Sequence, residues 1–293
     1  MASMRWARAL TPLTLGLLIF QALLVVTGGA VRLTGSGLGC PTWPECTPGS
    51  YRPTKNQAEG TLHSWIEFGN RLLTFVLVAF ALATLITVLR AGRKDLRILA
   101  AGQFLGIFGQ GILGGITVLT HLNPLAVASH FLLSTILIAA ATSLHSRRKA
   151  PAVKTGIKGS VNSFSKTHIM WASIVIILGT LVTGAGPHAG DINAPRLKIR
   201  IQDAALFHGG AVTILLLFTI AFYFRKDIST LTKKRLAIFL GICLAQGGIG
   251  YIQYLQGVPE LLVGMHLIGT TLVWIAAWRI WLSVQFKTKE VAQ

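Results

Sequence analysis

The sequence predicts an all-α membrane protein with eight spanning helices, arranged as two related four-helix halves. Three observations support this prediction: long apolar runs, basic residues gathered between alternate runs, and motifs repeated at matched spacing. The chain of 293 residues is 52% hydrophobic and 12% charged, which excludes an ordinary soluble domain. Each apolar run has about 18 to 25 residues, enough to cross a bilayer. The runs cover about residues 11–31, 66–89, 96–119, 125–144, 167–186, 207–224, 236–256 and 260–283.

The net charge is +18, and the distribution of the basic residues along the chain predicts the membrane topology. Basic residues gather on one side of the predicted membrane at 90–97, 147–166, 225–235 and 287–289. By the positive-inside rule this side is cytoplasmic, so we expect both termini inside the cell and a multi-pass protein of the cell membrane. The charge would contact anionic lipid, and its distribution argues against nucleic acid as a partner. The first run follows Arg5 and Arg8 and is longer than a signal-peptide core, so it is interpreted as a retained helix.

The first run opens into a loop of about residues 32 to 62 on the opposite, oxidising side. Cys40 and Cys46 lie there within GCPTWPEC, and the residues between them, two of them proline, allow the sulfurs to meet. We therefore predict a disulfide. It either staples the loop or is redox-active, and the sequence does not separate the two. Cys243, alone in the seventh run, is expected to pack in the core.

The stretch HSWIEFGNR, residues 63–71, overlaps the start of the second run and places an acid at the outer mouth of a membrane helix. At about 100° per residue, His63, Glu67 and Asn70 fall within roughly 60° of one another on one helical face. A charged group costs about 2.5 kcal/mol or more at the centre of a membrane helix and less towards the interface, so Glu67 is a candidate functional residue facing the protein interior. The alternative is an interfacial Glu67 that only pairs with Arg71.

The two halves of the chain are related in sequence. VVTGGAV near the end of the first run echoes LVTGAGP near the end of the fifth. The third and seventh runs share the positions Gln110, Gly111 and Gly114 with Gln246, Gly247 and Gly250. In each half a histidine, His130 or His266, follows the matched glutamine at the same interval. We therefore expect a parallel repeat, with one half in residues 1–150 and the other in 151–293, joined by the basic linker 145–166.

Histidines lie at matched depth near the outer ends of these helices. His208 in the sixth run corresponds approximately to Asn70 in the second, and His266 corresponds to His130. A lone membrane histidine is often a hydrogen-bonded core residue. A pair on facing helices is instead a common way to hold haem iron, so we predict a metal or haem between the helices. The glycines that would leave room for a porphyrin are Gly209, Gly210 and Gly264.

Other candidates rank lower. His145 and His168 lie at cytoplasmic helix ends and are expected to be solvated. His188 lies in the outer loop GAGPHAGD, where a functional role stays open. The outer arginines Arg71, Arg196 and Arg200 could pair with haem propionates, and a surface or topological role is the alternative.

Six segments in this order resemble the haem A synthase family, whose members oxidise haem O to haem A for terminal oxidases. They are TGSGLGCPTWPEC, IEFGNR, LNPLAVASHFL, TGAGPHAGD, FHGG and MHLIG, and the resemblance covers nearly the whole chain. It implies a haem b in the second half with His208 and His266 as axial ligands and as the metal site. It also implies a substrate haem in the first half, with Glu67 and His130 as catalytic residues and His130 as a ligand of the iron.

The resemblance makes Cys40 and Cys46 similar to the family's outer-loop cysteine pair. One departure matters, because the family commonly has histidine where this chain has Asn70, and an amide is a poor ligand for iron. His63 lies on the same face but about 10 Å away along the helix axis. We expect Asn70 and Arg71 to contact the substrate haem, and its iron to be held by His130 alone or with a weak or exogenous sixth ligand. The third outer loop, residues 187–206, also lacks the further cysteine pair that the family often has.

The implied reaction is the successive oxidation of one methyl group of haem O to a formyl group, through a hydroxylated intermediate. The haem would carry the oxidation while the protein supplies position and electrostatics. Glu67 would donate or accept a proton, or orient the reacting edge of the macrocycle. Expected partners are haem O, membrane lipid, haem O synthase and terminal oxidase assembly factors; a homo-oligomer stays open. The rival functions are a non-catalytic b-type cytochrome and a haem-handling transporter or assembly factor.

Overall fold

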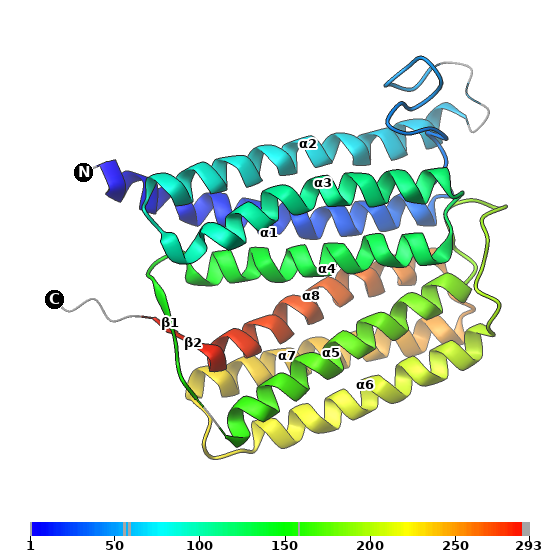
Figure 1. The fold of residues 1–293 in the computed structure, drawn as a ribbon. Coiled ribbons are helices and arrows are strands. Elements are labelled where there is room, and N and C mark those ends of the chain that lie inside the picture. Colours follow the sequence, from blue (N-terminus) through cyan, green and yellow to red (C-terminus); the bar gives the residue numbers. More distant parts are fainter. Residues whose placement is uncertain (1, 55–56, 58–59, 158, 289–293) are drawn as a thin grey trace.

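The computed structural model describes residues 2–54, 57, 60–157 and 159–288 (Figure 1). Lys158 and Lys289, which belong to the basic clusters named above, lie outside the described residues. Eight helices in the described part are long and apolar enough to cross a membrane, so the chain is a multi-pass helical membrane protein. They are α1 (Ala2–Leu33), α2 (Thr61–Arg90), α3 (Arg97–Leu119), α4 (Pro124–Arg147), α5 (Ser160–Ala185), α6 (Ile201–Tyr223), α7 (Thr230–Leu255) and α8 (Glu260–Gln285).

Several helices begin earlier than the sequence predicts. The helix α5 starts at Ser160 and α6 at Ile201, several residues before their apolar runs. Hydropathy marks only the part of a helix that lies in hydrocarbon, whereas backbone hydrogen bonds continue through the interfacial ends, where water solvates polar side chains. The predicted spans are therefore correct in number and too short at their polar ends.

Short elements connect the helices at one end of the molecule. A 3₁₀ turn, η1 (Lys94–Leu96), leads into α3. The strand β1 (Ala152–Lys154) in the linker pairs antiparallel with β2 (Phe286–Thr288) after α8, with Val153 opposite Lys287. This two-stranded sheet ties the linker between the halves to the end of the described chain, and the sequence patterns do not predict it.

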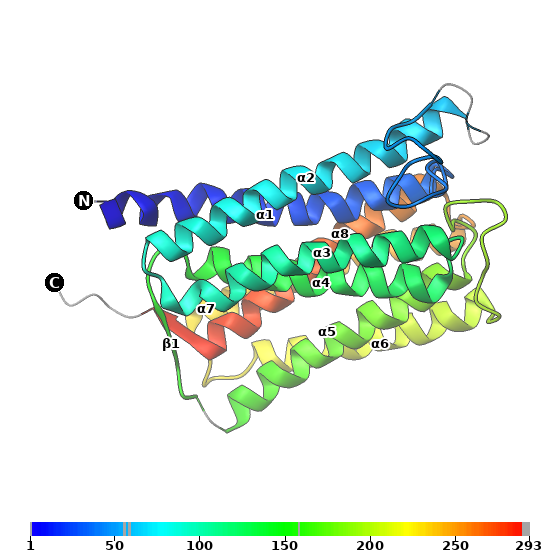
Figure 2. The same cartoon turned by 45° about the horizontal axis from the view of Figure 1, so that its top comes forward.

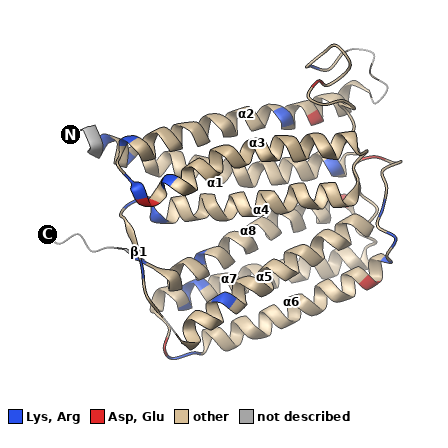
Figure 3. Cartoon of the chain, in the orientation of Figure 1, with Lys and Arg blue, Asp and Glu red and all other residues tan. Residues whose placement is uncertain are grey.

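The first and last described residues lie at this same end of the helix bundle (Figure 1). Many of the lysines and arginines gather there as well (Figure 3). The structure thus places the predicted basic clusters on one side. The assignment of that side to the cytoplasm remains a prediction from the positive-inside rule.

The helices form two groups of four, α1–α4 and α5–α8 (Figures 1 and 2). Within each group, consecutive helices contact one another, and the first also contacts the last. Each group has its own buried apolar cluster, and α4 contributes to both clusters through Ile138 in one and Ala141 in the other. The groups meet mainly where α4 and α1 contact α8.

Turn chemistry fixes the start of α4, the helix that carries His130. His121 and Leu122 have φ angles of 51° and 60°, a left-handed conformation that reverses the chain after α3. The side chain of Asn123 then accepts a hydrogen bond from the backbone N–H of Leu125 at 2.9 Å, which caps the helix. Pro124 occupies the first turn, where no N–H donor is needed.

Candidate functional site

His208 on α6 and His266 on α8 face each other in the second half. Their ring centroids are 6.4 Å apart, with the ring planes inclined by 67°. Two imidazole nitrogens, each about 2 Å from one metal ion, place their ring centroids about 6 Å apart. The observed separation is close to the value expected for two imidazoles on one iron ion.

Hydrogen bonding fixes which nitrogen of His208 is free. Its Nδ1 lies 3.0 Å from the carbonyl oxygen of Val175 on α5. A carbonyl only accepts, so Nδ1 carries the proton and Nε2 of the neutral ring keeps a lone pair. This is the arrangement expected of a metal-binding histidine oriented by a backbone carbonyl. The Nδ1 atom of His266 is buried without a hydrogen-bond partner in the described structure.

Two glycines make room for these rings. A methyl group at Gly250 on α7 would lie 3.0 Å from Cε1 of His266, and one at Gly179 on α5 would lie 3.3 Å from Cε1 of His208. Larger side chains at these positions would push the imidazoles out of place. The repeat identifies Gly250 from the sequence, but Gly179 and Val175 could not be found there, because nothing in the local pattern of α5 shows which turn faces a histidine of another helix.

The first half repeats this frame around His130. The side-chain amide of Gln110 donates to the carbonyl oxygen of His130 at 3.2 Å and to the hydroxyl of Ser134 at 2.6 Å. In the second half Gln246 donates in the same way to the carbonyl of His266 and to Thr270. A methyl group at Gly114 would lie 3.3 Å from Cε1 of His130. The sequence repeat is thus also a repeat of contacts, with His130 and His266 held alike.

Asn70 stands where the second half has His208. Its Oδ1 accepts a hydrogen bond from the hydroxyl of Thr27 on α1 at 2.7 Å. The side chain is therefore held by α1 through its oxygen. His63, the other histidine considered for this half, lies at the start of α2 with Nδ1 2.8 Å from the hydroxyl of Ser36.

Glu67 is buried, with 6% of its surface exposed, and both carboxylate oxygens have partners. Oε2 accepts from the backbone N–H of Cys40 at 2.7 Å, and Oε1 accepts from Nη2 of Arg71 at 2.7 Å. The pairing of Glu67 with Arg71, one of the two interpretations left open by the sequence, is present, and the carboxylate in it is buried. Arg71 also donates to backbone carbonyls of the segment between α1 and α2, residues 34–60, which we name the outer loop.

The predicted disulfide between Cys40 and Cys46 is present in the outer loop. Both cysteines are fully buried. Cys243 is also buried, as predicted for a packing residue. Burial of the disulfide favours the staple over a pair that exchanges freely with solutes in this conformation.

The remaining candidates have mainly structural contacts. Nε2 of His188 lies 2.7 Å from the carbonyl oxygen of Val258. Arg196 donates to the carbonyl of Pro187, and its pKa is lowered because burial of the guanidinium outweighs the opposing effect of Asp191. Arg200 forms an exposed ion pair with Asp203 at 2.7 Å. Pairing of Arg71, Arg196 and Arg200 with propionates remains a prediction.

The prediction that His168 is solvated is wrong. Only 1% of its surface is exposed, and its Nε2 lies 3.2 Å from the hydroxyl of Thr219. The helix α5 begins about two turns earlier than expected, so His168 lies inside the bundle rather than at its end. His145 is partly buried, with Nδ1 3.1 Å from the hydroxyl of Thr14.

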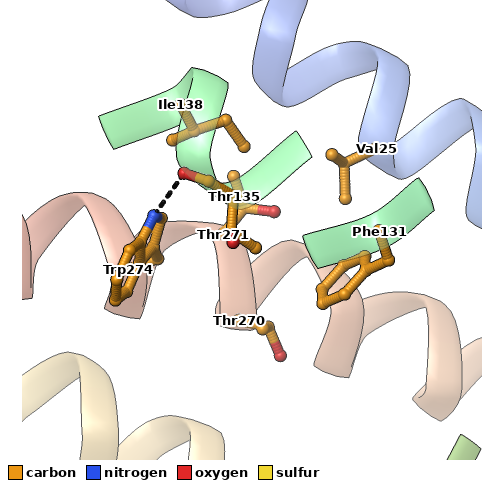
Figure 4. A pocket seen from close by; sticks show the side chains of 7 residues that line it. All are labelled: Val25, Phe131, Thr135, Ile138, Thr270, Thr271 and Trp274. Atoms are coloured by element: carbon orange, nitrogen blue, oxygen red, sulfur yellow. Dashed lines mark hydrogen bonds between the residues drawn. The ribbon is translucent and has the colours of Figure 1, made fainter. Parts of the chain in front are cut away.

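The interface between the two helix groups, where α1 and α4 contact α8, is named the seam here and is closely packed. A cavity of about 10 Å³ lies between α1, α4 and α8, and Trp274 donates across the seam to the carbonyl of Thr135 at 2.7 Å (Figure 4). This volume holds at most about one water molecule. A porphyrin does not fit in this cavity.

The described residues contain no group of three or more His, Cys, Asp or Glu side chains that could hold a bare metal ion. A haem iron needs only axial ligands from the protein, because the porphyrin supplies the other four nitrogens. The donor set of two facing histidines, with one free Nε2 fixed by its tautomer, therefore fits a haem better than a zinc-type site.

Fold and site together define a multi-pass helical membrane protein with a histidine-bearing frame in each half. The chain belongs to the family described as cytochrome oxidase assembly protein, whose model matches residues 11–192. Among its relatives are three proteins named heme A synthase. The protein from Lysinibacillus sphaericus is 34% identical over 42% of this chain and 40% of its own length. Those from Exiguobacterium sp. and Azorhizobium caulinodans are 25% and 28% identical, and the matches cover 81% and 87% of this chain and 79% and 88% of theirs.

Proposed function

We propose that this protein is a haem A synthase that oxidises a methyl group of haem O to a formyl group. The observation that carries the proposal is the pair His208 and His266, 6.4 Å apart, beside a matching frame in the first half that has one histidine only. A permanently bound haem and a substrate haem would need two similar sites that differ in the number of histidines available to the iron. The names of the relatives support the same activity.

We assign the resident haem b to the second half, residues 151–293. His208 and His266 would be its axial ligands, and Val175 orients the first of them. Haem b bound there would supply one-electron transfer to or from the other half. Each helix group has its own buried apolar cluster, with α4 as the helix that contributes buried residues to both, and this supports the division of the chain.

We assign the substrate haem O to the first half, residues 1–150. His130 would hold its iron, because the ring is framed like His266 by a glutamine and a glycine. Asn70 would leave the opposite side without a strong protein ligand, since its oxygen already accepts from Thr27. Glu67 and Arg71 close the outer end of this half through their bonds to the outer loop.

We further propose that both termini are cytoplasmic and that both haem sites lie towards the outer face. The basic clusters at the end that carries the termini support this orientation (Figure 3). The substrate implies a membrane enzyme that produces haem O upstream and a terminal oxidase assembly route that uses haem A downstream.

The direct test is to incubate the purified protein with haem O, oxygen and a reductant, then extract and identify the haems. The hydroxylated and formyl products are expected. Glu67→Ala is expected to lose this conversion while it keeps the absorption of low-spin haem b. If neither product forms under a competent electron supply while haem b is bound, a non-catalytic b-type cytochrome explains the His208–His266 pair better.

A further inference from the structure

The outer loop is fastened to α2 by two adjacent turns of that helix. The carboxylate of Glu67 accepts the backbone N–H of Cys40, and Nη2 of Arg71 lies 2.9 Å from the carbonyl oxygen of the same cysteine. The backbone N–H and the backbone carbonyl of Cys40 are thus both bound by side chains of α2. The residues that hold it also bind each other, with Nη2 and Nε of Arg71 at 2.7 and 3.2 Å from Oε1 of Glu67.

Arg71 also forms hydrogen bonds with other backbone groups of the disulfide loop. Nη2 is 3.1 Å from the carbonyl oxygen of Thr42, and Nη1 is 3.1 Å from that of Glu45. Three backbone carbonyls between the two cysteines, counting that of Cys40, therefore converge on one guanidinium. A guanidinium carries five N–H donors in a planar fork, which lysine cannot reproduce.

The loop also packs directly on the helices. A methyl group at Gly39 would lie 2.4 Å from the carbonyl oxygen of His63, so only glycine allows this approach to the first turn of α2. On the other side, a methyl group at Gly115 of α3 would lie 2.5 Å from the indole of Trp43. The loop therefore bridges α2 and α3, and its anchor on α3 is next in sequence to Gly114, where an added methyl group would lie 3.3 Å from Cε1 of His130.

In the described part of the second half, the positions matched to Glu67 and Arg71 carry no acid–arginine pair. If Asn70 is aligned with His208, the positions of Glu67 and Arg71 are taken by Ala205 and Gly209. In the matched register of α3 and α7, Tyr251 stands where Gly115 receives Trp43. A four-helix half of this design packs without the acid–arginine pair, so the pair serves the outer loop rather than the bundle.

We propose that Glu67 and Arg71 form a latch that holds the disulfide loop closed over the outer end of the first half. Arg71 is then a positioning residue for the reaction, and Glu67 acts through the position of the loop rather than by carrying a proton to or from the substrate. This inference deepens the proposed function and, for its effect on turnover, rests on it.

The latch is tested first without any turnover. In the full-length, haem-loaded protein in detergent, the Cys40–Cys46 disulfide is treated with a soluble phosphine, and released thiols are counted by maleimide mass shift. Arg71→Gln is expected to speed reduction at least tenfold, because the buried sulfurs become exposed, while haem b absorption stays unchanged. Arg52→Gln, which removes an exposed arginine of the same loop, is the matched control and should leave the rate as it is. An unchanged rate in Arg71→Gln overturns the latch whether or not the protein converts haem O.

Gly115→Ala gives a second route that leaves the ion pair intact. The added methyl group should displace Trp43 and also speed reduction, whereas Gly111→Ala, which has open space around the added methyl, should not. If Arg71→Gln does not fold, this pair of variants decides, and equal rates in the two overturn the proposal.

Glu67→Gln separates the latch from proton transfer. The amide oxygen can still accept from Cys40, but the ion pair with Arg71 is lost. The latch predicts that turnover falls in parallel with faster disulfide reduction and that the pH profile of turnover keeps its shape. Lost turnover with a fully protected disulfide would instead assign Glu67 to proton transfer. Absence of conversion in the unmodified protein would overturn the proposed function, while the reduction rates would still decide the latch.

Discussion

The two halves build the same frame around a histidine and differ in what stands opposite. Gln110 and Gln246 hold the backbone of His130 and His266 in the same way. Opposite His266, a second imidazole lies at 6.4 Å, while the matched position in the first half is Asn70. The comparison teaches that the repeat supplies the scaffold, and that under the proposed function the residue at the matched position of α2 or α6, asparagine or histidine, would set the number of strong iron ligands.

The halves also differ at their outer ends. The first half has a disulfide loop fastened by Glu67 and Arg71, and the second has Ala205 and Gly209 in the matched positions. A resident group needs only a fixed pair of ligands. A substrate site must also control position and access at its mouth, so the latch belongs with the half that has fewer ligands.

Removal of either second-half histidine should have the largest effect. His208→Ala or His266→Ala is expected to abolish the low-spin haem b signal, because a single imidazole no longer holds the iron from both sides. Reduced-minus-oxidised absorption spectra measure this directly. His63→Ala, which removes a histidine near the outer loop, should keep the signal, and a normal spectrum in either of the first two variants would refute the ligand assignment.

Asn70→His should make the first half resemble the second. An imidazole on α2 would offer the missing ligand opposite His130, so haem O bound there is expected to change from a high-spin to a low-spin spectrum. The measurement is the absorption or electron paramagnetic resonance spectrum of protein loaded with haem O. A low-spin spectrum already present in the unmodified protein would show that another group fills the sixth position.

A smaller effect is expected when the space beside a ligand is reduced. In Gly250→Ala the added methyl group would lie 3.0 Å from Cε1 of His266, which forces the ring to shift and should lower haem b occupancy a few-fold. Gly247→Ala has no neighbour within 4 Å and serves as the control on the same helix. Equal haem content in the two variants would mean that the ring does not need its present position.

The smallest effect concerns the seam between the halves. Trp274→Phe removes the indole N–H that bonds to the carbonyl of Thr135 (Figure 4) and should destabilise the protein by about 1 kcal/mol. Thermal unfolding followed by the helix signal in far-ultraviolet circular dichroism measures this loss of stability. The haem b content is expected to stay unchanged. A loss of haem b in this variant would show that the seam supports the second-half ligands.

Much of this architecture could be predicted from the sequence, because membrane spans depend on local hydropathy and the repeat preserves its spacing. The eight helices, the disulfide and the packing of Cys243 follow from such local signals. Contacts between distant elements could not be predicted. The burial of His168 depends on where α5 begins, and the fit of Trp43 on Gly115 depends on the path of the outer loop.

The interpretation of Glu67 shows the same limit. Sequence alone left both a functional acid and a partner of Arg71 open. The structure shows that the acid is buried and that it is also bound to Arg71. The contacts with the outer loop, from the backbone N–H of Cys40 to Glu67 and from Arg71 to three backbone carbonyls, reveal what the pair holds, and nothing local to α2 predicts them.

The most direct test of unequal haem sites is to identify the haems that remain after each half loses its matched histidine. Protein produced together with a haem O synthase is purified as wild type, His130→Ala and His266→Ala, and the haems are extracted and separated. The account predicts that His266→Ala loses haem b, whereas His130→Ala keeps haem b and loses haem O and its products. Loss of the same haem from both variants would contradict it.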